Sequence, residues 1–122
     1  MSGGAFHLTL TPEAIADLPE SEWQDFRPGV SLYPLYGKPP GRQSSALLRY
    51  QPGARVPGHS HLGVEHILVI QGSQEDENGH YPAGTLLISP TGSSHHVASA
   101  EGCVVLAVWS EGIQVNETEK SP

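Results

Sequence analysis

Glycine and proline recur so often along this chain that long helices are excluded. The 122 residues include 14 glycines and 11 prolines, which is about twice the average usage of these two residues. They separate short runs of β-branched and apolar residues that arrive about every 10–15 residues, a rhythm typical of an all-β sandwich or barrel. The length allows one domain of ordinary size, so the sequence predicts a single all-β domain.

Five runs have the composition of strands, and they occupy residues 30–36, 45–50, 64–71, 85–89 and 104–109. Pro34 favours a bent or edge position for the first of them, because proline cannot donate to a sheet ladder. Asn78 and Gly79 together predict a hairpin turn. The acidic run just before them, residues 75–77, is expected to be a solvated hairpin tip.

The N-terminal part of the chain predicts a short helix instead of a strand. Thr11 is a suitable N-cap and Pro12 suits the first helical position, so a helix is expected to follow and to end by Leu18. Residues 20–26 are expected to form a turn or loop. The predicted organisation is an N-terminal extension with the helix over 1–28, a barrel over 29–115 and a flexible tail over 116–122.

Charge and cysteine content exclude several classes of partner. The net charge is −7, from 6 Lys and Arg against 13 Asp and Glu, and binding to nucleic acid or to an anionic membrane depends on cationic contacts. Cys103 is the single cysteine, so no internal disulfide can form. No secretion signal and no apolar run of about 20 residues is present. We therefore expect a cytoplasmic protein with no nucleic-acid or membrane partner.

One short stretch carries the chemistry, and it reads His59-Ser60-His61-Leu62-Gly63-Val64-Glu65. In an extended segment side chains alternate between two faces, so His59 and His61 face the same way. Glu65 has the same parity and joins them if the chain bends only slightly at Gly63. Two imidazoles and a carboxylate suit a first-row divalent metal.

A second stretch, from Pro90 to His95, turns tightly after a strand and supplies one more imidazole. Together the two stretches resemble the cupin superfamily, whose first motif is G-x5-H-x-H-x3-E-x6-G and whose second is G-x5-P-x-G-x2-H-x3-N. Ser99 replaces the final Asn, a residue that is usually structural in this family. The matching residues are Gly53, His59, His61, Glu65 and Gly72 in the first motif and Gly84, Pro90, Gly92 and His95 in the second.

More narrowly, the chain is similar to the ChrR-type cupins. The carrying segments are residues 50–53, 65–72, 79–85, 89–95 and 101–103, and His66 stands where that group usually has a second Glu. The anti-sigma factors of this group carry a separate helical domain with its own Cys/His zinc site. Residues 1–44 contain one histidine and no cysteine, so we expect no direct binding to a sigma factor.

The resemblance implies a double-stranded β-helix barrel in which His59, His61, Glu65 and His95 bind one divalent transition metal. Ligand type does not decide between Fe, Zn, Mn and Ni. Three neutral imidazoles and one carboxylate leave the centre with a charge of about +1 and with open positions for water or another ligand.

The remaining candidate residues carry weaker expectations. His96, Tyr50 and Arg49 are candidates for a supporting contact with the metal ligands or the substrate, and strand parity does not choose between the last two. His66 is expected at a subunit interface or in solvent. Cys103 is expected to be a small buried residue, with redox sensing as the alternative. Further expectations are solvation of His80 and a packing role for Trp109.

Two functions of different classes fit this sequence. The first is a mononuclear Fe(II)-type dioxygenase, an oxidoreductase acting on a small chelating oxygenated substrate such as a diketone or hydroxyketone, with no catalytic residue separate from the metal site. The alternative is a zinc-binding, ChrR-like sensory or ligand-binding module without catalysis. We also expect a homodimer that pairs through the edge formed by residues 30–36.

Overall fold

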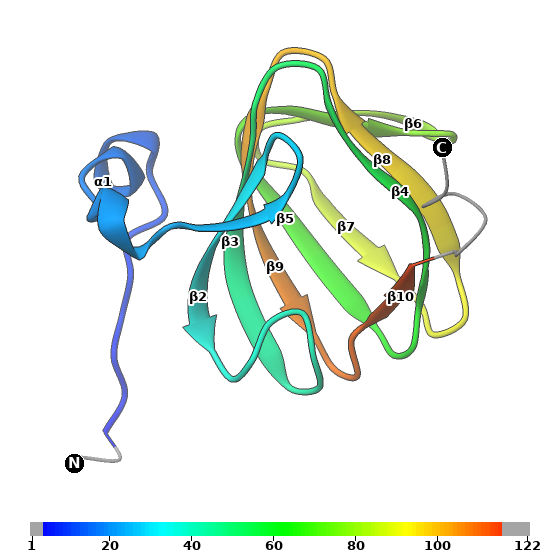
Figure 1. Cartoon of the computed structure of the whole chain (residues 1–122), viewed down its shortest axis with the longest axis horizontal. Coiled ribbons are helices and arrows are strands. Elements are labelled where there is room, and N and C mark those ends of the chain that lie inside the picture. The colour runs from blue at the N-terminus through cyan, green and yellow to red at the C-terminus, as the bar shows by residue number, and fades with distance from the viewer. Residues whose placement is uncertain (1–3, 116–122) are drawn as a thin grey trace.

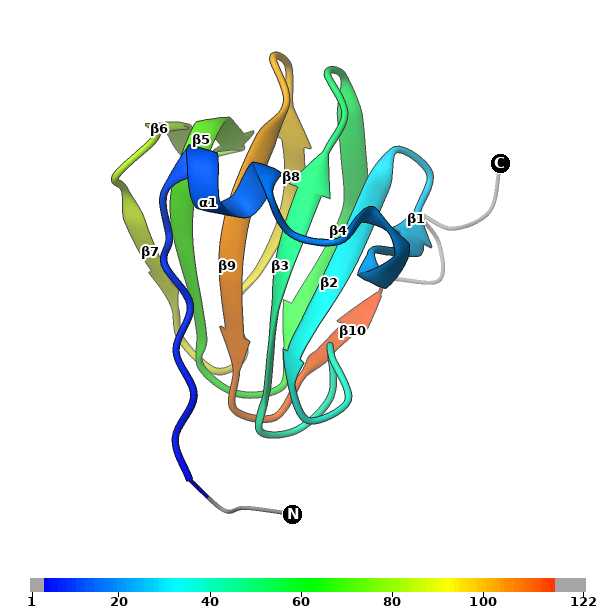
Figure 2. The ribbon, with the colours of Figure 1, turned by 90° about the vertical axis from the view of Figure 1, so that its left-hand side faces the viewer.

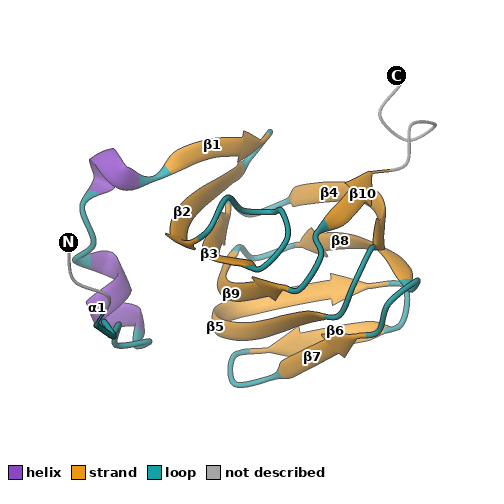
Figure 3. Cartoon of the chain, turned by 90° about the horizontal axis from the view of Figure 1, so that it is seen from below, coloured by secondary structure: helices purple, strands orange, loops and turns teal. Residues whose placement is uncertain are grey.

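The computed structural model describes residues 4–115, and these residues form the predicted all-β fold (Figure 1). Ten antiparallel strands form one curled sheet in the order β1-β2-β3-β9-β5-β8-β4-β10, with β6 and β7 also paired to β5. The sheet curls into a half-barrel, so that its two ends enclose a common interior (Figure 3). No helix in the described part of the chain is long and apolar enough to cross a membrane. The predicted tail over 116–122 lies outside the described residues.

The elements follow one another with short connections. Before the barrel come α1 (Pro12–Ala16), the 3₁₀ turn η1 (Glu20–Glu22) and β1 (Gln24–Arg27). The other strands are β2 (Val30–Tyr36), β3 (Ser44–Tyr50), β4 (Ala54–His61), β5 (Glu65–Asp76), β6 (Gly79–Pro82), β7 (Leu86–Ser89), β8 (Ser94–Ser99), β9 (Cys103–Trp109) and β10 (Ile113–Val115).

The main core fills the interior of the half-barrel. Leu48, Val69 and Val105 project into it from β3, β5 and β9, and all three are buried. Val56 and Val97 meet them from β4 and β8, on the other side of the interior. Each such side chain contributes about 1.5–3 kcal/mol when fully buried. This core fixes which faces of β4, β5 and β8 point inward, and therefore where their polar side chains converge.

A second core lies on the outer face of the sheet. Leu47 and Val104 point outward from β3 and β9, yet both are buried because Ile15 of α1 packs against them. The N-terminal residues lie across this face (Figure 2). Covering both faces explains why residues 45–50 and 104–109 read as nearly continuous apolar runs instead of alternating ones.

The N-terminal segment is attached to the sheet by polar contacts as well. Thr11 is the N-cap as predicted, with its hydroxyl oxygen accepting a hydrogen bond from the Ala14 N–H at 3.2 Å. The Arg49 guanidinium donates to both carboxylate oxygens of Glu20, at 3.1 and 2.6 Å. It also lies 4.1 Å from the centre of the Trp23 ring. Helix α1 itself is shorter than predicted and ends at Ala16.

The sequence missed the strand that begins the sheet. Residues 20–26 were predicted to form a turn or loop, but Gln24–Arg27 form β1, which pairs with β2 across a tight turn at Gly29, where φ is +77°. Pairing with β2 overrides the weak local preference of these residues. Strand β2 is therefore second in the sheet, and β1 pairs with it only from Val30 to Leu32. Pro34 lies in the part that β1 does not pair with, next to an irregularity in the β2–β3 register.

The predicted hairpin forms, but its turn lies one residue earlier than expected. Strands β5 and β6 pair with Asp76 opposite Gly79, so Glu77 and Asn78 are the two connecting residues. The Asp76 side chain accepts hydrogen bonds from the N–H groups of Asn78 and Gly79. This side-chain contact replaces the positive φ angles that a turn centred on Asn78-Gly79 would use.

Strand β5 continues past Gly72 into this hairpin, whereas the predicted apolar run ended at residue 71. The φ angle of Gly72 is +74°, and a Cβ atom on it would lie 2.0 Å from the carbonyl oxygen of Gly102. Glycine is therefore required both by the backbone conformation and by the close approach of the neighbouring chain.

We predict that Gly72→Ala destabilises the fold by roughly 2–4 kcal/mol, because it adds an overpacking cost to the strain of a positive φ. Gly84→Ala is the matched control, since Gly84 has φ +93° but open space around its Cβ position. It is expected to cost only about 1 kcal/mol. Urea unfolding of both variants measures the difference, and equal losses would show that the contact with Gly102 contributes nothing.

Candidate metal centre

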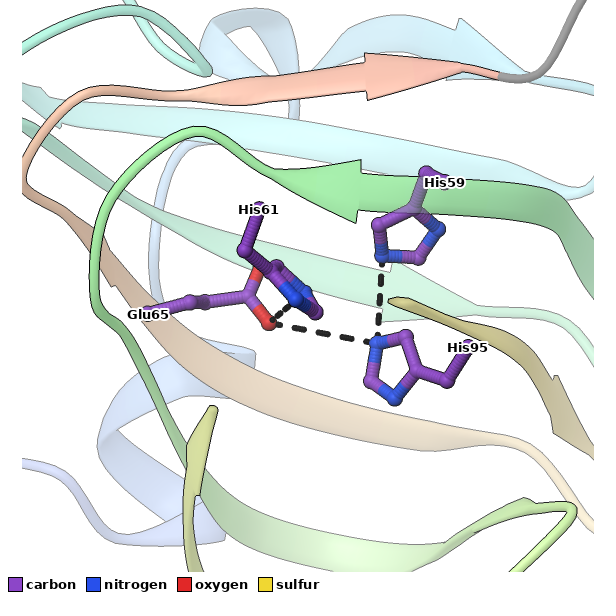
Figure 4. Close-up of side chains that lie close together, drawn as sticks. All are labelled: His59, His61, Glu65 and His95. Carbon is purple, nitrogen blue, oxygen red and sulfur yellow. Dashed lines mark hydrogen bonds and ion pairs between the residues drawn. The ribbon is translucent and has the colours of Figure 1, made fainter. Parts of the chain in front are cut away.

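Three strands bring the four candidate ligands together (Figure 4). His59 and His61 lie at the end of β4, Glu65 begins β5, and His95 lies near the start of β8. The antiparallel pairing of β4 with β8 places His59 directly opposite His95. The turn between β4 and β5 is short, so Glu65 returns to the same side as the two histidines of β4.

The four groups are buried and very close. Each residue offers one ligand atom, and these four atoms all lie within 4.8 Å of one another. The four residues are between 1% and 8% exposed. The Nε2 atoms of His59 and His95 are 3.1 Å apart, and Nε2 of His61 lies 3.0 Å from Oε1 of Glu65. Apart from each other, neither of these last two atoms has a hydrogen-bond partner among the described residues.

Hydrogen bonds on the far side of each ring fix where the protons are. The Nδ1–H of His59 donates to the Pro57 carbonyl at 3.0 Å. The Nδ1–H of His61 donates to the carbonyl and hydroxyl oxygens of Ser93, at 3.0 and 2.9 Å. In His95 the Nδ1–H donates to Oδ2 of Asp76 at 3.2 Å. A neutral imidazole has one N–H, so all three Nε2 atoms present bare lone pairs to the centre.

The carboxylate is oriented in the same way. Trp109 donates its Nε1–H to Oε2 of Glu65 at 2.7 Å, which leaves Oε1 facing the three Nε2 atoms. Lone pairs that point at one another at these distances repel unless a cation lies between them, and a buried carboxylate needs compensation as well. The donor set therefore fits a divalent transition metal, with His59, His61, Glu65 and His95 as the ligands.

The pKa shifts follow from burial and from the contacts within the cluster. Burial lowers the pKa of His59, since desolvation disfavours the imidazolium form. Burial also acts to lower the pKa of His61, but the adjacent Glu65 carboxylate prevails and raises it. Burial would raise the pKa of Glu65, yet the surrounding imidazoles and the Trp109 N–H lower it. Glu65 is thus held as a carboxylate facing a neutral His59.

Two spaces border the four groups. Inside the barrel a cavity of about 20 Å³ is lined by His59, Glu65, His95 and mainly apolar residues, and this volume holds about one water-sized molecule. Tyr50 and Gln74, which share a side-chain hydrogen bond, also line it. On the other side, a groove of about 260 Å³ reaches His61 and His95. The groove is the larger of these two spaces.

The structure separates the three residues that were candidates for supporting contacts. Tyr50 faces the inner cavity, whereas Arg49 lies on the outer face with Glu20 and Trp23. The His96 side chain is 48% exposed and its Nδ1 lies 2.9 Å from a carboxylate oxygen of Glu77. His96 therefore points away from the side of β8 that carries His95.

Two sequence interpretations need correction at this site. Trp109 was expected only to pack, but its indole N–H orients Glu65. The acidic run was expected to be a solvated tip, but the Asp76 side chain is only 6% exposed and contacts His95. Alternation along β5 would turn Asp76 away from Glu65. An irregularity between Val69 and Gln71 shifts that alternation, so parity in the sequence gave no signal for Asp76.

The comparisons with known proteins identify the class. Residues 11–111 match the ChrR Cupin-like domain, so the chain belongs to this family of cupins. Anti-sigma-E factor ChrR from Cereibacter sphaeroides is 31% identical to it over 113 residues, which are 86% of this chain and 52% of that protein. The chain thus spans about half the length of this curated relative.

Solved structures agree on the fold. The complex of Rhodobacter sphaeroides SigE with the anti-sigma ChrR matches with a TM-score of 0.62 and 29% identity, over 75% of this chain and 47% of that one. An acetylacetone dioxygenase from Acinetobacter johnsonii matches with a TM-score of 0.74 over 98% of this chain and 84% of that one. Its identity is 12%, so this likeness concerns the fold alone.

Cys103 lies apart from the four ligands and is buried at the start of β9. Burial raises the pKa of its thiol to about 11. Because the thiolate is the reactive form, we predict that a thiol reagent leaves the native protein unlabelled at pH 8 and modifies it once guanidinium unfolds the chain. Labelling rates with and without denaturant measure this. Rapid labelling of the native protein at pH 8 would restore the redox-sensing interpretation.

Proposed function

We propose that this cupin binds one divalent transition metal through His59, His61, Glu65 and His95, and acts as an Fe(II)-type dioxygenase on a small chelating oxygenated substrate of the diketone or hydroxyketone class. The observation that supports the metal site is the set of three Nε2 atoms and one carboxylate oxygen that face one another in a buried space. The Nδ1 hydrogen bonds hold these nitrogen atoms in place without any metal.

The four ligands leave part of the coordination sphere of such a metal open. A bound divalent metal supplies a Lewis acid at which a chelating substrate can replace water. The surrounding residues then decide what reaches it. The inner cavity borders His59, Glu65 and His95, and the groove borders His61 and His95, so a substrate would approach through one of these two spaces.

The fold supports this proposal only in general terms. A solved acetylacetone dioxygenase shares the fold over nearly all of this chain, which shows that a barrel of this shape can carry dioxygenase chemistry. Fold likeness does not transfer a substrate. The substrate class is therefore argued from the open coordination positions, which suit a small chelating ligand.

One observation favours a second function, a zinc-binding sensory or ligand-binding module without catalysis. The chain is 31% identical to the anti-sigma factor ChrR over 86% of its length. In this alternative the metal links the end of β4 to β5 and β8 and so stabilises the barrel. A ligand that binds at the metal then alters the association of the barrel with a partner. A cytoplasmic location and a homodimer remain part of either proposal, although β1 pairs with Val30 to Leu32, so residues 30–36 are not the free edge that was predicted for dimer pairing.

Metal content tests the site itself. We predict one equivalent of divalent metal per chain in the native protein and none in His61→Ala, because His61 is an inward-facing ligand. His80→Ala is the matched control, since His80 is an exposed histidine on the hairpin. Saturating the site with metal should raise Tm by roughly 10 °C in the native protein and in the control. Metal retained at full stoichiometry by His61→Ala would contradict the site.

Oxygen consumption separates the two functions. We predict that protein loaded anaerobically with Fe(II) consumes one O₂ per substrate with at least one member of a panel of β-diketones and hydroxyketones. His61→Ala under the same conditions should remain at the background of free Fe(II). Zinc found at one equivalent in the protein as isolated, together with no oxygen uptake by the Fe(II)-loaded form, would instead support the binding module.

A further inference from the structure

The three histidine ligands are not held in the same way. His59 and His61 donate their Nδ1–H groups to neutral oxygens of Pro57 and Ser93. Only His95 donates to an ionisable group, the carboxylate of Asp76, with Nδ1 and Oδ2 3.2 Å apart. A carboxylate accepts a stronger hydrogen bond from the Nδ1–H than a neutral carbonyl does. The stronger hydrogen bond makes the Nε2 of the same ring a better electron-pair donor to a metal.

The hairpin between β5 and β6 holds this carboxylate in position. Oδ1 of Asp76 accepts from the Asn78 N–H at 2.8 Å, from the Gly79 N–H at 3.2 Å and from the Tyr81 hydroxyl at 2.8 Å. Three donors on one oxygen leave Oδ2 for His95. The Asp76 side chain is 6% exposed and that of His95 is 9% exposed, so water screens this contact very little.

We propose that Asp76 is a positioning residue of the metal centre, fixing the His95 ring and making its Nε2 the strongest of the three nitrogen donors. This inference rests on the proposed metal site. It also changes the charge of the buried centre. Glu65 and Asp76 together carry −2, so a divalent metal with three neutral imidazoles gives a buried unit with no net charge.

The neighbouring residue provides a matched control. Glu77 belongs to the same turn and contacts the next histidine, accepting from the backbone N–H of His96 at 3.0 Å and lying 2.9 Å from its Nδ1. That contact is exposed and lies on the outer face of β8, where it touches no metal ligand side chain. Glu77→Gln therefore perturbs the hairpin and removes a charge without altering the His95 hydrogen bond.

The experiment measures Zn²⁺ affinity by competition with a chelator for the full chain and two variants. Asp76→Asn keeps the shape of the side chain and removes the charge, and its amide nitrogen replaces one of the two accepting oxygens, so a single oxygen remains to accept either from His95 or from the hairpin donors. We expect it to weaken Zn²⁺ binding by about 10–100-fold. Glu77→Gln should stay within about threefold of the native protein. Circular dichroism of the metal-free forms checks that both variants keep the fold.

A spectroscopic readout separates positioning from a general loss of structure. In the zinc-loaded protein each histidine ligand has one Nδ1–H proton, observable by NMR. Asp76→Asn should move the His95 proton upfield and leave those of His59 and His61 in place. Equal Zn²⁺ affinity in the native protein and Asp76→Asn, or equal shifts of all three protons, would overturn the inference while leaving the metal site intact. No zinc binding by the native protein would overturn the proposed metal site itself.

Discussion

The pairing of β4 with β8 is the constraint on which the site depends. It sets His59 opposite His95 with their Nε2 atoms 3.1 Å apart, and the short turn into β5 adds Glu65. None of these groups can relax away, because each ring is anchored on its far side and the carboxylate is anchored by Trp109. The barrel thus holds four donor groups in a preorganised arrangement around one point, which favours tight metal binding.

The sequence predicted the four converging groups because their signal is local. His59, His61 and Glu65 lie on one extended stretch, where parity and one short bend decide their direction, and the family motif added His95 at a fixed distance. The structure brings these four residues together. The outer contacts had no such signal. Trp109 meets Glu65 only through the register between β5 and β9, and that register is a property of the whole sheet.

The same distinction holds for the fold. Apolar runs with flanking glycines identified β2, β3, β7 and β9 almost to the residue, because buried strands have a distinctive composition. Strands β1, β4, β8 and β10 were not among the predicted runs. The two short ones, β1 and β10, gain their stability from pairing with an existing sheet and not from their own residues. The shifted alternation in β5 is a further case. It turned Gln74 and Asp76 inward, and no local pattern announces such a shift.

The covering of the outer sheet face has a consequence for how the domain can be handled. The sequence predicts residues 1–28 as an extension of the barrel, yet Ile15 and Leu18 pack on the same cluster as Leu47 and Val104, and Glu20 binds Arg49. A shortened gene product starting at residue 29 would leave that hydrophobic face bare to water. Such a fragment would tend to self-associate, so the smallest independently soluble unit has to begin ahead of the helix.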